Sequence, residues 1–216
     1  MITHLTSTRH HAAARLSRPD PYPCSSRGEL RKTPANKSGT DRPTYVYCGT
    51  VQNWRETCDV IASLVDVVLL DIGGTLVAEH PPLTPTDALD VKLLNNVARD
   101  LPLLSSIVRL GAATNTAVMR EAEVRALLAK VAIDQYMEVV VTSSDVGAAK
   151  PNPAVLLEAT RRMGDVDPHR TLYIGDRQSD ADAAQRAGMN YTMVGANGIL
   201  AALIDWVKRS EGARIT

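Results

Sequence analysis

From Val65 onward, short apolar runs alternate with longer amphipathic stretches, and this alternation constrains the fold more than any other feature of the chain. Repeated strand–helix alternation of this length is typical of a parallel sheet with helices on both faces. The expected strands are residues 66–71, 107–114, 137–142, 171–175 and 191–194. The expected helices are residues 84–97, with Thr84 as cap, then 117–131, 153–163, 180–187 ahead of a Gly188 cap, and 199–209. The sequence therefore predicts a three-layer, Rossmann-like α/β fold.

Composition and charge narrow the classes of function. A chain of 216 residues has room for one sizeable domain plus extra segments. Acidic and basic residues balance at 24 each, but the first forty residues hold seven basic and two acidic ones. The remainder is therefore net negative, which disfavours nucleic-acid binding by the globular part.

The three cysteines and the hydropathy pattern indicate a reduced compartment and no membrane span. Three is an odd number, and no CxxC pair occurs, which argues against a disulfide framework and against a zinc site. A cytoplasmic location is the default for such a chain. No apolar run approaches the roughly 20 residues that are needed to cross a bilayer.

Residues 1–43 are rich in Ser, Thr, Arg, His and Pro and show no helical or strand periodicity. Such a segment buries too little apolar surface to offset the entropy of ordering it. An unstructured extension is the favoured interpretation, and a transit peptide or a mis-assigned start site are the alternatives. We expect the extension to include residues 1–62 and the folded domain to include residues 63–212.

Polar side chains follow four of the expected strands, where each strand ends. In an open parallel sheet, ligands bind beyond the carboxyl ends of the strands. Carboxylates at this edge suit Mg²⁺, which needs one or two of them together with phosphate and water. An ammonium and a hydroxyl there suit a phosphate. The residues concerned are Asp71, Thr114, Asn115, Lys150, Asp176 and Asp180.

Four segments of the chain resemble, in the same order along the sequence, the four motifs of the haloacid dehalogenase-like (HAD) superfamily of phosphotransferases. The similarity extends from Val65 to Gly195. Each motif taken singly has a structural explanation, such as a capped helix start, but all four occur in order and each follows an expected strand. The motifs are LLDIGGTLV at 69–77, AATN at 112–115, KPNP at 150–153 and IGDRQSDADAAQRAGM at 174–189.

The resemblance implies a nucleophile and a magnesium site. Asp71 would attack phosphorus and form an aspartyl-phosphate. The Asp71 carboxylate and the Gly73 carbonyl would bind Mg²⁺, Asp176 would complete the metal site, and Asp180 would ligate directly or through water.

The resemblance also implies a phosphate-binding set. Thr114 and Asn115 would bind the transferring phosphoryl group, and Lys150 would neutralise its charge. Lys150 would also pair with Asp71 or with Asp176. Because phosphoryl transfer depends mostly on positioning and charge stabilisation, this set suffices for the first step.

Gly73 departs from the family pattern. In phosphatases of the superfamily, a second aspartate at this position is the general acid and base, a contribution usually worth about 10²–10⁴ in rate. One interpretation is a phosphatase for acyl or aryl phosphates, whose leaving groups need little protonation. In a second, Glu79 or His80 folds back over the site, although both are more simply explained as surface residues. In a third, turnover is lost. The first two together are favoured over the third.

The spacing of the motifs leaves no room for a separate cap domain. The interval from Thr75 to Thr114 holds one loop and one helix, and the interval from Thr114 to Lys150 holds one helix and one strand. An uncapped site admits large substrates. The expected function is a Mg²⁺-dependent phosphatase acting on a phosphorylated small molecule or a phosphoprotein. The alternative is an impaired domain that binds a phosphorylated ligand or a partner protein.

Overall fold

The structure is a computed structural model of the whole chain, and it describes residues 29–32, 45–48, 54–79, 89–94 and 96–212. Most of the segment that the sequence predicts to be unstructured lies outside these residues. Two short strands are described there, β1 (Glu29–Lys32) and β2 (Tyr45–Cys48), and they pair antiparallel. None of the predicted site residues lies in these two strands.

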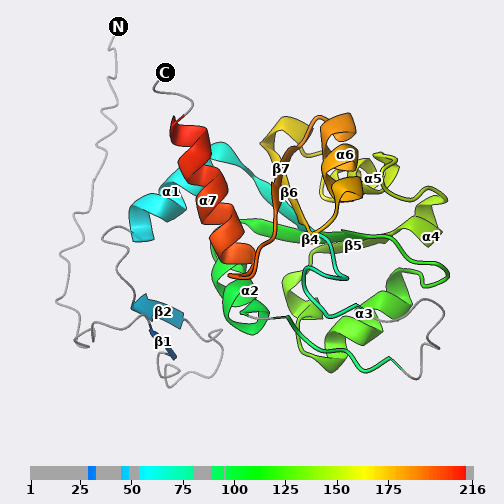
Figure 1. Ribbon diagram of the computed structural model, residues 1–216, viewed down its shortest axis with the longest axis horizontal. Coiled ribbons are helices and arrows are strands. Elements are labelled where there is room, and N and C mark those ends of the chain that lie inside the picture. The colour runs from blue at the N-terminus through cyan, green and yellow to red at the C-terminus, as the bar shows by residue number, and fades with distance from the viewer. Residues whose placement is uncertain (1–28, 33–44, 49–53, 80–88, 95, 213–216) are drawn as a thin grey trace, which may run out of the picture.

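The centre of the fold is a parallel sheet of five strands in the order β5-β4-β3-β6-β7 (Figure 1). All four strand pairs are parallel, which confirms the predicted α/β class. The strands are β3 (Val67–Leu70), β4 (Arg109–Thr114), β5 (Val139–Thr142), β6 (Thr171–Gly175) and β7 (Asn190–Met193).

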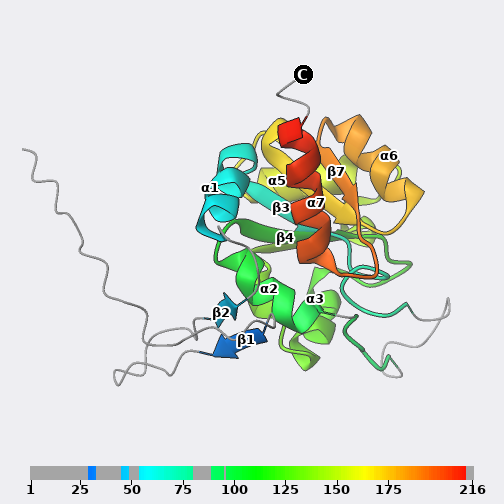
Figure 2. The same ribbon diagram turned by 60° about the vertical axis from the view of Figure 1, so that its left-hand side comes forward.

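Helices cover both faces of this sheet, which confirms the three-layer prediction (Figures 1 and 2). One face carries α1 (Trp54–Leu64), α2 (Val97–Ser105), α3 (Glu121–Lys130) and α7 (Ile199–Gly212). The other face carries α5 (Ala154–Arg162) and α6 (Gln178–Ala187). Shorter elements are α4 (Ser143–Val146), η2 (Asp134–Tyr136) and η3 (Pro168–Arg170). No helix among the described residues is both long enough and apolar enough to span a bilayer.

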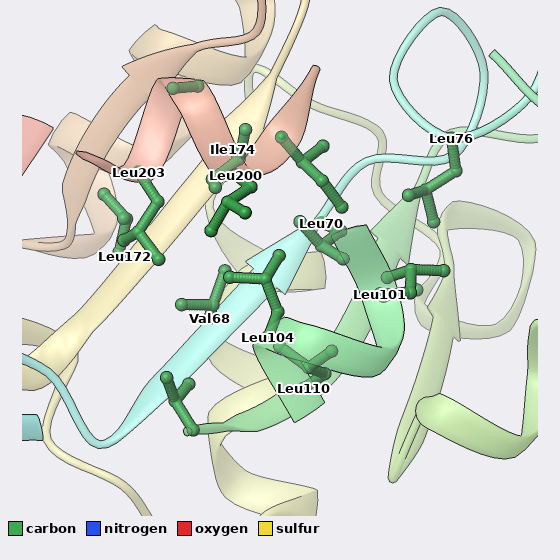
Figure 3. Close-up of a cluster of buried hydrophobic side chains, with 14 of the residues drawn as sticks. Val68, Leu70, Leu76, Leu101, Leu104, Leu110, Leu172, Ile174, Leu200 and Leu203 are labelled. Carbon is green, nitrogen blue, oxygen red and sulfur yellow. The ribbon is translucent and has the colours of Figure 1, made fainter. Parts of the chain in front are cut away.

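The period-2 geometry of strands explains why β3 is apolar throughout. Successive side chains point to opposite faces, and both faces are covered. Val68 and Leu70 pack toward α2 and α7 (Figure 3). Val67 and Leu69 pack toward α5 and α6. All four side chains are fully buried. A charged residue that follows such a strand is therefore carried to the edge of the core.

The helix predicted for residues 84–97 is wrong in its described part. Residues 80–88 lie outside the described structure, residues 89–94 are not helical, and α2 begins only at Val97. The N–H of Ala78 instead donates to the carbonyl oxygen of Lys92 at 2.8 Å. Backbone pairing with the loop after β3 thus overrides a helical spacing of apolar residues.

The folded unit begins earlier than the predicted boundary at residue 63. Helix α1 begins at Trp54, and the side chain of Ile61 is fully buried in the core beside α7. The sequence analysis includes these residues in the extension because they precede the first clear strand–helix alternation at Val65.

A buried carboxylate ties α2 to the beginning of α7. Asp100 is fully buried, and its carboxylate accepts hydrogen bonds from the Leu200 backbone N–H at 3.1 Å and from Arg99 Nε at 2.7 Å. Burial raises the pKa of Asp100, while the hydrogen bond from Arg99 opposes this rise. An acceptor at this point satisfies one of the free N–H groups of the α7 N-terminus.

We predict that Asp100→Ala lowers the free energy of unfolding by about 1–3 kcal/mol, because it leaves a buried N–H without an acceptor. Urea denaturation would measure this loss. Asp100→Asn keeps an oxygen acceptor and should lose less. The control is Asp205→Ala, since the Asp205 side chain is 63% exposed on α7. Equal stability of Asp100→Ala and the control would contradict the prediction.

Candidate active site

The site lies where the order of strands reverses in the sheet: β3 to β5 are added on one side, and β6 and β7 on the other. Strand β3 lies between β4 and β6, and the connection after β5 returns to the far side of β3 to begin β6. Such switch points are where ligands bind in open α/β sheets. Asp71 follows β3 and Asp176 follows β6, so both carboxylates emerge at this switch point.

The ammonium of Lys150 lies between two buried carboxylates. Its Nζ is 2.7 Å from Asp71 Oδ1 and 2.7 Å from Asp180 Oδ1, and it donates to Tyr173 Oη at 2.6 Å. The side chains of Lys150, Asp71 and Asp180 are 3%, 8% and 1% exposed. The sequence predicts pairing with Asp71 or Asp176; the structure has Asp71 and Asp180, because Asp180 projects inward from the first turn of α6.

Asn115 positions Lys150. Its Oδ1 accepts from the Lys150 N–H at 2.9 Å, and its Nδ2 donates to the Lys150 carbonyl oxygen at 3.1 Å. The sequence assigns Asn115 to phosphate binding, whereas the structure engages its amide with the backbone of Lys150. Thr114, the other residue of this pair, is buried as the last residue of β4, beside the ends of β3 and β5.

Tyr173 belongs to the site and is missed by sequence reasoning. Its hydroxyl donates to the carbonyl oxygen of Ala113 at 2.8 Å and lies 3.4 Å from Asp180 Oδ1. Burial, followed by the negative charge of Asp71, raises the pKa of Tyr173 well above its usual value, so the phenol stays protonated. Its place in the apolar strand β6 predicts only a core residue.

Three carboxylates converge on one point. Asp71, Asp176 and Asp180 each offer an oxygen, and the three oxygens lie within 4.8 Å of one another. Two buried side-chain oxygens among the described residues lack a hydrogen-bond partner, Asp176 Oδ1 and Thr75 Oγ1, and both belong to the loops at this edge. Because an oxygen-rich cluster with a buried acceptor to satisfy suits a hard divalent cation, these residues fit Mg²⁺.

Burial and like charge act on two of these carboxylates. Burial raises the pKa of Asp71, and the neighbouring Lys150 opposes that rise. Burial and then the charge of Asp180 raise the pKa of Asp176. Because burial disfavours the charged forms of Asp71 and Asp176, a cation bound between them would offset that effect.

Two glycines make room for the carboxylates, because they have no side chain in the space that the carboxylates occupy. A Cβ at Gly74 would lie 2.2 Å from Asp176 Oδ2, and Gly74 has a φ of +78°. A Cβ at Gly175 would lie 2.4 Å from Asp180 Oδ2. Any side chain at either position would displace a carboxylate of the cluster.

Gly73 does not need to be glycine on conformational grounds. It is absent from the residues with positive φ among the described part of the chain, and the nearest atom to a Cβ built there is Glu79 Cγ at 3.9 Å. The position therefore has room for a side chain. Glu79 is paired with Arg177, which the sequence does not predict.

The chain is similar to one protein family and to phosphatases within it. A family model described as haloacid dehalogenase-like hydrolase matches residues 88–194, a range that includes Thr114, Lys150, Asp176 and Asp180. A glyceraldehyde 3-phosphate phosphatase of Methanopyrus kandleri is 39% identical over 82 residues, which are 38% of this chain and 34% of that protein. A phosphoglycolate phosphatase of Escherichia coli is 40% identical over 62 residues, which are 29% of this chain and 24% of that protein. The matches thus span about a quarter to a third of these two relatives.

Solved structures share the fold. A HAD-superfamily hydrolase of Ehrlichia chaffeensis superposes with a TM-score of 0.54 at 15% identity, covering 68% of this chain and 97% of that one. A HAD-superfamily hydrolase of Geobacter sulfurreducens gives a TM-score of 0.52 at 16% identity, covering 68% and 96%. At this identity the likeness shows the fold alone.

We predict that Gly175→Ala weakens divalent-cation binding at least about tenfold, because the new Cβ displaces Asp180 from a cluster whose supporting contacts typically set affinity 10- to 100-fold. Titration with Mn²⁺, followed by electron paramagnetic resonance, would measure the dissociation constant. Gly195→Ala is the control, since a Cβ there meets nothing within 4 Å. Unchanged affinity in Gly175→Ala would contradict the assigned cation site.

Proposed function

Because the haloacid dehalogenase-like hydrolase model matches residues 88–194, we propose that the chain is a hydrolase of this family, a Mg²⁺-dependent phosphatase of phosphate monoesters that works through an aspartyl-phosphate on Asp71. The observation that carries the proposal is the convergence of Asp71, Asp176, Asp180 and Lys150 at the switch point of the sheet. A buried carboxylate between an ammonium and a fitting cation site is equipped to attack phosphorus.

In the first step, a carboxylate oxygen of Asp71 forms a bond to phosphorus, and the bond from phosphorus to the leaving oxygen breaks. Lys150 offsets negative charge on the phosphoryl oxygens, and Thr114 donates a hydrogen bond to one of them. Asn115 holds the backbone of Lys150, and Tyr173 holds its ammonium. These residues are fixed before substrate arrives, as catalysis by positioning requires.

The proposed metal site consists of Asp71, Asp176, Asp180 and the Gly73 carbonyl. Its fit rests on the spacing of the carboxylates and on the buried, unpartnered Asp176 Oδ1. A bound Mg²⁺ supplies positive charge that stabilises the phosphoryl oxygens.

We propose a small phosphorylated metabolite as the substrate and a cytoplasmic setting for the reaction. The named activities of the relatives, on glyceraldehyde 3-phosphate and phosphoglycolate, support this substrate class. No separate cap domain lies among the described residues between β3 and β5, which hold α2, α3 and η2. A phosphoprotein is the second substrate class that such an open site admits.

The competing function is a domain that binds a phosphorylated ligand without turnover. Gly73 is the observation that favours it, since this position carries the acid–base aspartate in the phosphatases that the chain resembles. Hydrolysis of para-nitrophenyl phosphate separates the two functions, because nitrophenolate leaves without a proton.

We predict that the wild-type chain, mixed with acetyl phosphate and Mg²⁺, gains the mass of one phosphoryl group on Asp71. Intact-protein mass spectrometry would measure this adduct. Asp71→Asn should not form it, because the amide is a poor nucleophile. Asp66→Asn is the matched control, since Asp66 precedes the same strand at its other end and is paired with Arg170. If Asp71→Asn is labelled as fully as the wild type, the proposed mechanism is wrong.

A further inference from the structure

Glu79 lies beside the space that a side chain at position 73 would enter. Its Cγ and Oε1 are 3.9 Å and 4.0 Å from the point where a Cβ on Gly73 would stand. A carboxylate six positions further along the chain therefore lies beside the position where the family pattern carries an aspartate. Its side chain is 48% exposed, so water reaches it.

The backbone that leads to Glu79 is held by pairing within the loop after β3 and with the segment around Lys92. Gly73 and Val77 form a parallel bridge, and the N–H of Ala78 donates to the Lys92 carbonyl oxygen at 2.8 Å. These contacts hold the chain up to Ala78, the residue directly before Glu79.

Arg177 connects the side chain of Glu79 to the residues of the cation site. Arg177 Nη2 donates to Glu79 Oε1, and the backbone N–H of Arg177 donates to Asp180 Oδ2 at 3.0 Å. Arg177 also follows Asp176 directly, and its Nε lies 4.0 Å from Asp176 Oδ2. One residue therefore connects Glu79 to two of the three carboxylates of the cluster.

We propose that Glu79 is the general base that activates water for hydrolysis of the aspartyl-phosphate on Asp71, with Arg177 as its positioning residue. This inference rests on the proposed function. One O–H bond of the water breaks and its proton passes to the Glu79 carboxylate, while the water oxygen bonds to phosphorus. The bond from phosphorus to the Asp71 oxygen breaks, and its electron pair restores the Asp71 carboxylate. The proton on Glu79 then leaves to solvent, and inorganic phosphate is released.

The two half-reactions make different demands on the chain. Phosphorylation by an acyl or aryl phosphate needs no proton donor, because the leaving group is stable as an anion. Hydrolysis of the phosphoenzyme is accelerated by a base whichever donor supplied the phosphoryl group, because the attacking water must lose a proton. A carboxylate side chain is a common general base and so suits this second role. Loss of Glu79 should therefore slow only the second half-reaction.

An exposed ion pair can also be merely a surface feature, and the chain contains a matched example. Glu138 is 45% exposed and is paired with Arg109 at the amino end of β4, the opposite edge of the sheet. Exposed pairs of this kind contribute about 0.2–1 kcal/mol to stability. The Glu79–Arg177 pair has a similar exposure. It differs from the Glu138–Arg109 pair because it lies beside the loop after β3, which begins with the proposed nucleophile Asp71.

The experiment compares the wild type with Glu79→Gln and with the control Glu138→Gln. Each protein is phosphorylated with acetyl phosphate and Mg²⁺, the phosphate donor is removed, and the decay of the adduct is followed by intact mass. We expect Glu79→Gln to be phosphorylated at the wild-type rate and to lose the phosphoryl group about 10²-fold more slowly, the lower limit for general base catalysis. Glu138→Gln should behave as the wild type.

A second variant separates proton transfer from a change in local shape. Gly73→Asp in the Glu79→Gln background places a carboxylate in the same space, and the room beside Gly73 allows it. This double variant should recover at least a tenth of the lost decay rate. Gly73→Asn in the same background has the same shape without a base and should not recover it.

The outcomes distinguish this inference from the proposed function. A phosphoenzyme that decays equally fast in the wild type and in Glu79→Gln overturns the role of Glu79 and leaves the aspartyl-phosphate mechanism standing. Equal recovery by Gly73→Asp and Gly73→Asn overturns it too, because shape alone would then explain the effect. Absence of any adduct on Asp71 in both the wild type and Glu79→Gln overturns both.

Discussion

The site depends on one interaction, the ammonium of Lys150 held between the carboxylates of Asp71 and Asp180. It joins the loop after β3, the loop before α5 and the first turn of α6, three segments that are far apart in sequence. Removing one partner from a buried ion pair typically costs about 3–5 kcal/mol, because the remaining charge stays buried. Here two carboxylates would be left, so Lys150 serves stability as well as charge neutralisation.

The same interaction explains why a cluster of like charges is tolerated. Lys150 compensates one oxygen of Asp71 and one of Asp180, and the backbone of Arg177 satisfies another oxygen of Asp180. Asp176 Oδ1 stays buried without a partner. This arrangement leaves a place for one more positive charge, and Gly74 and Gly175 give the carboxylates the room to surround it.

Much of the fold follows from local patterns in the sequence. Five apolar runs become the five parallel strands because both faces of the sheet are covered, and the ends of those strands bring Asp71, Thr114 and Asp176 to one edge. The helical spacing around residues 89–94 fails because backbone pairing with the loop after β3 takes its place. Helix α1 is missed for a different reason, since the burial of Ile61 depends on tertiary packing against the core.

The details of the site are less accessible from sequence. Lys150 could be assigned to the site by its place after β5, but its choice of Asp180 over Asp176 depends on how α6 is oriented. Tyr173 looks like any core aromatic until its hydroxyl is seen beside Lys150. The proximity of Glu79 to Gly73 depends on a loop conformation that no periodicity encodes.

The most direct test is a crystal structure of the protein with Mn²⁺ in place of Mg²⁺, using anomalous scattering to locate the cation. The account predicts one strong anomalous peak bounded by the carboxylates of Asp71, Asp176 and Asp180. A peak at another place, or none there at saturating Mn²⁺, would contradict the claim that these three carboxylates form the metal centre beside the nucleophile.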